Sequence, residues 1–351
     1  MARMLLAALG KAGFDVFLAS REIAYSKRPG LEHLAMRKAA AMIEAGRLLS
    51  GFEANRNKPD LWFSYHPYDK SPDWLGEAVC LELGIPMVTA EPCKTAQGAN
   101  GEWLAWREES KRIIAHAAMN LVMTHSDREF LATFVPDDRV TWFDPFVETT
   151  LLQGDPSTPD PWSAGPNGVR LLSVGMMRPG AKIESYTLLC ESLMQLTDLD
   201  WSLVIAGGGP GEAEIQKQFA GLPMGRVQFL GTRSPGEILS LMAMAQVLAW
   251  PGCREAYGMV YLEAASVGLA SVALNTMGVP RVVEHQRTGL LASPADADTY
   301  ATMLRAIITD GELRARLGKG AAAFVAGERS GDAAAARLKL ILENVLGHRE
   351  P

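Results

Sequence analysis

The sequence has no long hydrophobic run and no concentration of charge of one sign. No apolar segment approaches the roughly 20 residues that a membrane-spanning helix needs, and the first residues lack the pattern of a signal peptide. The 351 residues carry 34 Lys and Arg against 40 Asp and Glu, a net charge of −6. Without a long basic run, nucleic acid is not an expected partner. We therefore expect a cytoplasmic protein.

Motifs for metals and for common cofactors are also missing. The chain contains no CxxC pair and no cluster of His and Cys, so we expect no metal and separate, reduced thiols. It has neither GxGxxG nor Walker A spacing, which argues against a nicotinamide cofactor and a P-loop. We expect no cofactor. The four cysteines are Cys80, Cys93, Cys190 and Cys253.

The dominant pattern is a short apolar run followed by a helix-like stretch, repeated along the chain. Near-continuous apolar strands between helices predict parallel sheets covered on both faces. Two such series predict an α/β fold with two doubly wound, Rossmann-like domains. The predicted strands are "DVFLAS", "LWFSY", "PMVTA", "NLVMTHS" and "VTWF" in the first series, and "VRLLSVG", "WSLVIAG", "RVQFLG", "QVLAWP" and "ASVALN" in the second.

Composition marks the domain boundaries. The segment "QGDPSTPDPWSAGPNG" is rich in Pro, Gly, Ser and Asp and has no apolar period, which is typical of a linker. After about residue 295 the chain becomes rich in Ala and Arg and helical in pattern. The predicted division is a first domain at 1–152, a linker at 153–168, a second domain at 169–330, and a helix at 331–351 that can pack back on the first domain.

The beginning of the chain departs from the doubly wound pattern. In that fold the first strand leads through a Gly-rich turn into the first helix. Here "ARMLLAALGKAG" already has a helical pattern, and "FDVFLAS" corresponds to the second strand. We therefore expect the first domain to lack its first strand, either because the start codon is assigned too late or because the fold omits this element.

Two loops of the second domain carry candidate ligand-binding residues. "LVIAGGGPGEAEI" places Gly208 and Gly209 between a strand and a helix, where backbone amides can approach an anion. "SVGMMRPGAKIESY" places Arg178 and Lys182 after another strand, and two such cations can clamp a diphosphate. A turn without a ligand and a pair of solvated charges are the alternative interpretations.

Two glutamates in "PGCREAYGMVYLEAASVG" suggest a binding site for an extended ligand. Glu255 lies in a loop, and Glu263 lies inside the helix that begins near Gly258. The second carboxylate stands roughly 7–8 Å further along the axis, with the first-turn amides of Met259 and Val260 between. Glu255 taken alone could be a carboxylate that is favoured by the dipole at the start of the helix. Glu263 is harder to explain without a ligand, because its neighbours have the pattern of buried residues and a buried glutamate without a partner is costly.

This stretch resembles the E-x7-E segment of retaining glycosyltransferases of the GT-B fold, most closely glycosyltransferase family 4. The resemblance runs from about residue 169 to 291 and includes "AGGGP", "RVQFLG" and "MGVPRVVEHQRTGLL". The first half is similar in layout only. The resemblance implies an N-terminal, acceptor-side domain and a C-terminal, nucleotide-sugar-binding domain that face each other across a cleft.

The resemblance implies a role for each matching residue. Glu255 would contact the hydroxyls of the donor sugar, and Glu263 would bind the ribose hydroxyls. Lys182 would neutralise the departing diphosphate. The amides around Tyr257, Gly258, Met259 and Val260 would hold sugar and phosphate.

Three positions differ from the family pattern. The family usually has an Arg six residues before the Lys; Met176 stands there, and Arg178 is the nearest substitute. An acidic residue of the family is replaced by Arg281, and a glycine by Met277. In the first half, His66 and Glu91 each follow a predicted strand and are candidates for acceptor binding; solvated loop residues are the alternative.

The implied activity is transfer of a hexosyl group from a UDP- or GDP-sugar to a saccharide or lipid-linked acceptor with retention of configuration, as in polysaccharide biosynthesis. In the mechanism usually proposed, the leaving phosphate takes the proton of the acceptor. Positive residues early in the chain permit peripheral contact with the inner face of a membrane, although a solvated helix face is the favoured explanation for them. These residues are Arg21, Lys27, Arg28, Arg37 and Lys38.

Other functions fit the sequence less well. A non-catalytic or truncated nucleotide-sugar-binding relative agrees with the missing strand, Met176 and Arg281, but not with the intact Glu255, Lys182 and Glu263. An epimerase can share the architecture, although the E-x7-E segment argues against it. A glycosidase needs carboxylates that flank a single bond.

Overall fold

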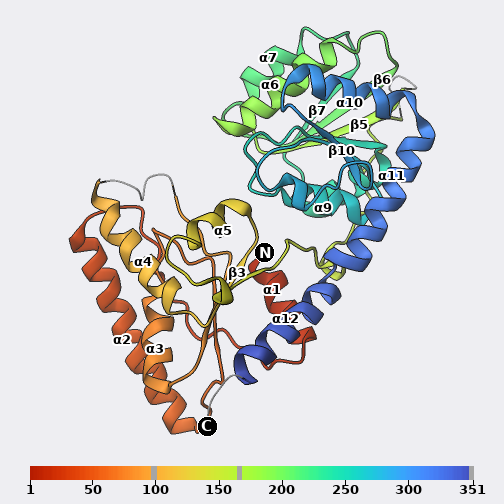
Figure 1. The fold of residues 1–351 in the computed structure, drawn as a ribbon. Coiled ribbons are helices and arrows are strands. Elements are labelled where there is room, and N and C mark those ends of the chain that lie inside the picture. The colour runs from red at the N-terminus through yellow and green to blue at the C-terminus, as the bar shows by residue number, and fades with distance from the viewer. Residues whose placement is uncertain (96–100, 164–167, 348–351) are drawn as a thin grey trace. The chain divides into compact units, whose positions relative to one another are not determined.

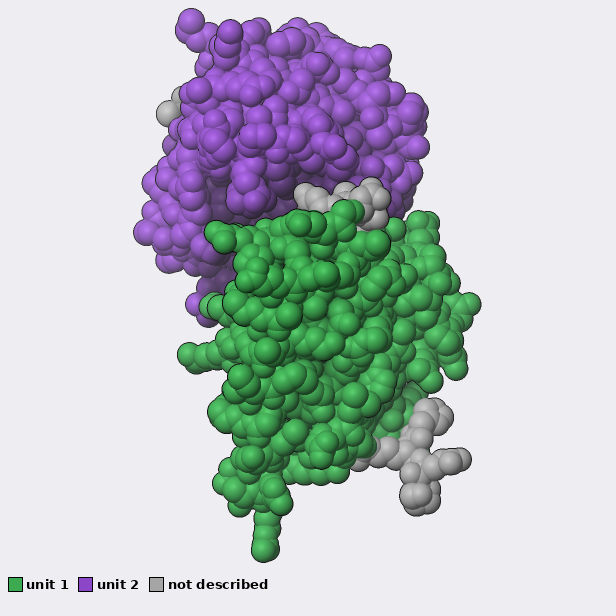
Figure 2. All heavy atoms as spheres, turned by 90° about the vertical axis from the view of Figure 1, so that its left-hand side faces the viewer, with its two compact units in different colours: residues 1–144, 335–351 green, residues 145–334 purple. Residues whose placement is uncertain are grey.

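The structure is a computed structural model that describes residues 1–95, 101–163 and 168–347. The chain forms two compact units (Figure 2). Unit 1 comprises Met1–Asp144 together with Ala335–Pro351, and unit 2 comprises Pro145–Ala334. Of the predicted linker, residues 164–167 lie outside the described residues, as do 348–351 of the predicted last helix.

Unit 1 is built on a parallel sheet with the strand order β1-β2-β3-β4. In Figure 1 the helices α2, α3 and α4 lie on one side of this sheet. Trp74 and Trp106 are buried in the core beneath them. The strands are β1 (Trp62–Tyr65), β2 (Met87–Ala90), β3 (Met119–Val122) and β4 (Val140–Trp142). The helices are α1 (Ala2–Lys11), α2 (Leu31–Asn55), α3 (Trp74–Leu83), α4 (Leu104–His116) and α5 (His125–Leu131).

The predicted strand "DVFLAS" is wrong. Residues 14–26 form no strand, and Phe17 and Leu18 are 50% and 67% exposed. The strand β1 is hydrogen-bonded to β2 alone in the described sheet. The backbone N–H and C=O groups of a strand need hydrogen bonds to a neighbouring strand. This apolar segment pairs with no strand of the described sheet.

Unit 2 is built on a six-stranded parallel sheet with the order β10-β9-β8-β5-β6-β7. Helices lie on both sides, with α6 and α7 on one and α9 on the other (Figure 1). The strands are β5 (Val169–Val174), β6 (Trp201–Ala206), β7 (Val227–Gly231), β8 (Val247–Ala249), β9 (Ser271–Leu274) and β10 (Gly289–Ala292). The helices are α6 (Ala181–Met194), α7 (Glu212–Phe219), α8 (Pro235–Met244), α9 (Met259–Ser266), α10 (Ala297–Thr309), α11 (Gly311–Phe324) and α12 (Gly331–Gly347), which continues into unit 1.

The strand order of unit 2 reverses at β5, which pairs with β6 on one side and β8 on the other. In open parallel sheets the loops after the strands at such a point form the usual ligand crevice. A ligand site is therefore expected at the loops after β5 and β8. None of the helices in the described part of the chain is long and apolar enough to cross a bilayer.

Candidate functional site

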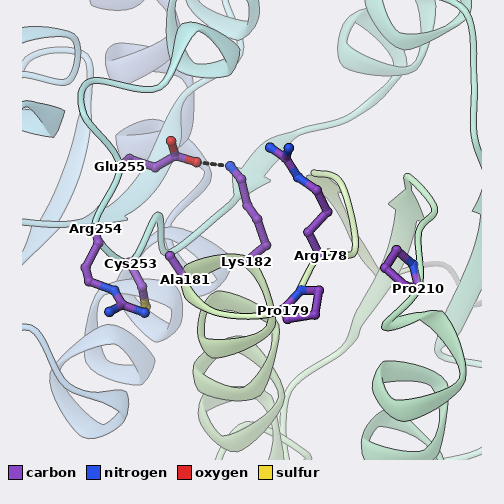
Figure 3. A pocket seen from close by; sticks show the side chains of 8 residues that line it. All are labelled: Arg178, Pro179, Ala181, Lys182, Pro210, Cys253, Arg254 and Glu255. Carbon is purple, nitrogen blue, oxygen red and sulfur yellow. Dashed lines mark hydrogen bonds and ion pairs between the residues drawn. The ribbon is translucent and has the colours of Figure 1, made fainter. Parts of the chain in front are cut away.

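A pocket of about 550 Å³ lies in unit 2 at the point where the strand order reverses. Its size falls in the range of small-molecule sites. The loops after β5 and β8 and the start of α6 supply most of its wall (Figure 3). The lining residues are Arg178, Pro179, Ala181, Lys182, Pro210, Cys253, Arg254 and Glu255.

The pocket holds an ion pair between Lys182 and Glu255, drawn as a dashed line in Figure 3. Lys182 stands in the first turn of α6, and Glu255 stands in the loop after β8. Both side chains are largely buried, at 24% and 18% exposure. The structure thus brings together two predicted site residues that are far apart in sequence.

Trp250, which sequence analysis treated as the end of a strand, supports this ion pair. Its indole N–H donates to Glu255 Oε1 at 3.4 Å, and Lys182 Nζ lies 5.1 Å from the centre of its ring. The Tyr261 hydroxyl donates to the Trp250 carbonyl at 2.9 Å. Trp250 is fully buried, so its ring has a fixed position and orients the Glu255 carboxylate and the Lys182 ammonium through these contacts.

The pocket has an excess of positive charge. Arg178 extends in the same direction as Lys182 (Figure 3) and forms no ion pair with the described residues. Arg254 is paired with Glu184 on the exposed face of α6. Carboxylates therefore offset two of the three cations, and the uncompensated charge of Arg178 favours an anionic ligand electrostatically.

The glycine-rich turn after β6 supports the pocket through close packing. A Cβ at Gly209 would lie 2.5 Å from the Met177 carbonyl oxygen. The Met177 N–H donates to the Gly208 carbonyl at 2.9 Å. The glycines therefore lock the turn against the loop that carries Arg178, and Pro210 is the residue of this turn that lines the pocket.

The loop that carries Glu255 also needs glycine. Gly252 has a φ of 71°, and a Cβ there would lie 2.2 Å from the Tyr261 hydroxyl. Gly258, with a φ of 77°, immediately precedes α9. The helix predicted from Gly258 to about Val267 is confirmed, because α9 spans Met259–Ser266.

The remaining predicted donor residues lie along the start of α9 and are not among the pocket-lining residues. Tyr257, Gly258, Met259 and Val260 are partly exposed. Glu263 is also partly exposed, between the buried Leu262 and Ala264. Burial raises the pKa of Glu263 above its ordinary value, so its carboxylate is held in a medium that disfavours the charge.

The structure also describes the positions that depart from the family pattern. Met277 has a φ of 46°, a conformation that favours glycine, and its side chain is 53% exposed. The backbone therefore keeps a glycine-like turn although the glycine is absent. Met176 is 52% exposed.

In unit 1 the structure brings His66 and Glu91 together. His66 Nδ1 lies 3.6 Å from Glu91 Oε2, and the Tyr65 hydroxyl donates to the same Oε2 at 2.9 Å. Burial raises the pKa of Asp127 to about 6, although the hydroxyl of Thr124 opposes this shift. Among the described residues, no group of three or more His, Cys, Asp or Glu side chains is arranged to hold a metal ion.

Comparison with known proteins gives a consistent result for unit 2. Residues 163–324 match the family model described as Glycosyl transferases group 1. The sulfoquinovosyl transferase of Arabidopsis thaliana is 34% identical over 122 residues, which are 34% of this chain and 23% of that protein. A D-inositol 3-phosphate glycosyltransferase of Corynebacterium efficiens is 31% identical over 157 residues, 42% of this chain and 36% of that protein. These alignments span about a quarter to a third of the relatives' length.

One alignment is longer, with a mannosyltransferase of Mycobacterium tuberculosis. This GDP-mannose-dependent alpha-(1-6)-phosphatidylinositol monomannoside mannosyltransferase is 25% identical over 291 residues, 77% of this chain and 75% of that protein. Among solved structures, a glycosyltransferase of Rickettsia africae has a TM-score of 0.70 at 14% identity, covering 95% of this chain and 85% of that one. Anabaena HepE in complex with UDP has a TM-score of 0.68 at 16% identity, covering 91% and 85%.

The predicted fold class is confirmed: the chain forms two Rossmann-like units with parallel sheets, as in GT-B glycosyltransferase structures. The match of residues 163–324 also agrees with the predicted enzyme class, glycosyltransferase. Two findings were not anticipated, namely the support of the ion pair by Trp250 and the pairing of His66 with Glu91. An aromatic residue at the end of an apolar strand gives no sequence signal beyond that of a core residue.

Proposed function

We propose that the protein transfers a hexosyl group from a nucleotide-diphosphate sugar to a saccharide or lipid-linked acceptor with retention of configuration. The observation that carries this proposal is the Lys182–Glu255 ion pair above Trp250, beside Arg178, at the switch point of the sheet. The match of this region to a glycosyltransferase family supports it.

The donor would bind through unit 2. The diphosphate of the donor would compete with Glu255 for the Lys182 ammonium, and it would also bind the Arg178 guanidinium. Release from Lys182 leaves the Glu255 carboxylate able to accept hydrogen bonds from sugar hydroxyls. Glu263 would accept hydrogen bonds from the ribose, and the first-turn amides of α9 would hold the phosphates between. Retention, and membership of glycosyltransferase family 4, rest on the E-x7-E segment.

UDP and GDP sugars are the first donors to test. HepE has been solved with UDP, and the mycobacterial relative is named for GDP-mannose. Inositol phosphate and phosphatidylinositol mannoside appear in the names of two relatives, so an inositol-containing acceptor is the first choice for a panel of acceptors. His66 and Glu91 would bind the acceptor from unit 1.

A thermal-shift titration with UDP, GDP, ADP and their sugar conjugates tests the donor site. A ligand at 100 times its dissociation constant adds about 2.7 kcal/mol to the free energy of unfolding. We expect one nucleotide series to raise the melting temperature, and Arg178→Ala to weaken that effect. No shift with any nucleotide would contradict the proposal and leave a non-catalytic relative as the better interpretation.

We also propose that unit 1 contacts the inner face of an anionic membrane peripherally. Exposed apolar side chains at Leu18, Ile23 and Leu31 lie in the same stretch of chain as Arg21 and Lys27, a combination that suits an interface with anionic lipid. Co-sedimentation with phosphatidylglycerol vesicles should exceed that with phosphatidylcholine vesicles and should fall with salt. Equal, low binding to both would contradict this contact.

A further inference from the structure

Trp250 is a large aromatic residue at the point where the loop with Glu255 leaves the sheet. It directly follows β8, and it is 0% exposed, so it is too deeply buried to touch a ligand itself. Its indole nevertheless contacts both charged groups of the ion pair in the pocket, Lys182 and Glu255. A buried residue in this position can act on a ligand only through those two side chains.

Three neighbouring segments hold the Trp250 ring in place. The Tyr186 ring, on α6, packs against it edge to face at a centroid distance of 5.0 Å. Gly175, just after β5, lies so close that a Cβ there would be 2.8 Å from the Trp250 ring. The Tyr261 hydroxyl, on α9, donates to the Trp250 carbonyl at 2.9 Å. The indole therefore cannot turn without disturbing close-packed neighbours, and its N–H has a fixed direction.

Trp250 and Lys182 share one oxygen of the Glu255 carboxylate. The indole N–H donates to Oε1 at 3.4 Å, and the Lys182 ammonium binds the same Oε1. Within the described part of the chain, no side chain donates a hydrogen bond to Oε2. A separation of 3.4 Å is long for an N–H···O hydrogen bond, as expected where a charged donor occupies the same acceptor atom.

Under the proposed function, donor binding removes one of these two partners. The diphosphate draws the Lys182 ammonium away from Glu255, at the stage when the carboxylate must accept hydrogen bonds from sugar hydroxyls. The indole N–H then remains on Oε1 and can shorten its hydrogen bond. Because this donor is neutral and rigid, it orients the carboxylate without neutralising it, and Oε2 stays available to the sugar.

We propose that Trp250 is a positioning residue for the sugar of the donor and that it acts through Glu255. This inference rests on the proposed glycosyl transfer. Affinity for the nucleotide depends on Lys182 and Arg178, which bind the diphosphate. The additional affinity for the sugar depends on the orientation of the Glu255 carboxylate, which the Trp250 N–H maintains after Lys182 has changed partner.

Calorimetric titration of the full chain with UDP and with UDP-glucose separates the two parts of the donor; GDP and GDP-mannose replace them if only guanine nucleotides bind. Trp250→Phe keeps an aromatic ring beside Lys182 but removes the N–H. We expect it to weaken the binding of UDP-glucose at least about tenfold and to change that of UDP by less than about twofold. A general loss of packing would not distinguish the two ligands.

Trp201→Phe is the matched control. Trp201 is also fully buried in unit 2. Its indole N–H donates to the Leu196 carbonyl at 2.7 Å, and the Arg226 guanidinium lies 5.1 Å from the centre of its ring. Trp201 begins β6 whereas Trp250 follows β8, so the two stand at opposite ends of the parallel sheet. Trp201→Phe should lower the melting temperature but leave both affinities unchanged.

A double-mutant cycle shows whether the effect of Trp250 runs through Glu255. Glu255→Ala removes the acceptor of the indole N–H, so adding Trp250→Phe in that background should weaken UDP-glucose binding no further. Melting curves establish that each variant is folded at the temperature of titration. If Trp250→Phe does not fold, replacement of the Trp250 indole by benzothiophene makes the same comparison, because that ring keeps the shape and lacks the N–H.

Two results would overturn the inference. One is wild-type affinity for UDP-glucose after the N–H of Trp250 has been removed. The other is an equal loss of affinity in the wild-type and Glu255→Ala backgrounds, which would leave Trp250 with a packing role only. Either result, in a protein that binds UDP or GDP, contradicts this inference alone. A wild-type protein that binds no nucleotide would contradict the proposed function itself.

Discussion

Lys182 contacts both the carboxylate of Glu255 and the ring face of Trp250. Under the proposed function it neutralises the departing diphosphate, so Lys182→Ala should lower turnover about 100- to 1,000-fold. Lys217→Ala, an exposed lysine on α7, is the matched control and should have no effect. Steady-state rates of both variants decide the matter, and a near-normal rate for Lys182→Ala would remove this residue from the diphosphate site.

Glu263 links binding to stability. Because burial raises its pKa above the ordinary 4.5, the folded state holds this proton more tightly than the unfolded state. The contribution of Glu263 to stability is therefore complete below pH 4.5 and is lost as the pH rises through the folded pKa. Glu263→Gln should accordingly raise the melting temperature at pH 7 relative to wild type, but not at pH 4.

The same variant should weaken nucleotide binding, by about tenfold, because the carboxylate is a stronger acceptor for ribose hydroxyls than an amide. Melting curves at the two pH values and nucleotide titrations provide both measurements. Glu214→Gln, on the exposed face of α7, is the control that should change neither. A Glu263→Gln variant with wild-type UDP and GDP affinity would rule out the ribose role.

At the scale of elements, the turn after β6 packs its backbone directly against the backbone of the loop after β5. Gly209→Ala would place a Cβ 2.5 Å from a backbone oxygen of Met177, and backbone cannot yield as a flexible side chain can. We expect a loss of about 2–3 kcal/mol in the free energy of unfolding and weaker nucleotide binding.

Gly225→Ala serves as the control for this prediction. Gly225 also has a positive φ, of 81°, but nothing lies within 4 Å of its Cβ position. Gly225→Ala should therefore lower the free energy of unfolding only by the cost of a left-handed conformation in alanine, about 1 kcal/mol. Denaturant unfolding of both variants separates the clash from the strain, and equal losses would contradict the packing argument.

Sequence periodicity predicted most elements of this fold, and the exceptions have physical causes. Nine predicted strands are present as β1 to β9. "DVFLAS" has the apolar content of a strand, but whether such a segment pairs depends on a neighbour that local sequence does not specify. The strand β10, "GLLA", was missed because four apolar residues after a turn give no period to detect.

The part of the candidate site in unit 2 was predictable, because it depends only on which strands its residues follow. Arg178, Lys182 and Glu255 follow strands that meet at the switch point, and the structure gathers them in one pocket. His66 and Glu91 were each expected beyond a strand, but their pairing depends on two left-handed turns that no residue pattern announces.

For the whole molecule, the division into units predicts that donor binding is separable from the rest of the chain. All residues that line the pocket belong to unit 2, which has an extensive core of its own. A fragment of residues 145–334 should therefore bind the nucleotide within about threefold of the full chain. Calorimetric titration of the fragment and the full chain makes the comparison, and a folded fragment with no affinity would show that unit 1 is needed.

The last segment of the chain has a consequence for biosynthesis. Unit 2 is continuous in sequence, whereas unit 1 combines Met1–Asp144 with the segment that begins at Ala335, whose Leu338 and Leu342 are buried. A ribosome adds roughly 5–20 residues per second, so the larger piece of unit 1 emerges many seconds before its closing helix. Unit 2 can complete its core during that interval. The half of the protein that is translated first is therefore completed last, because its fold requires the segment that begins at Ala335.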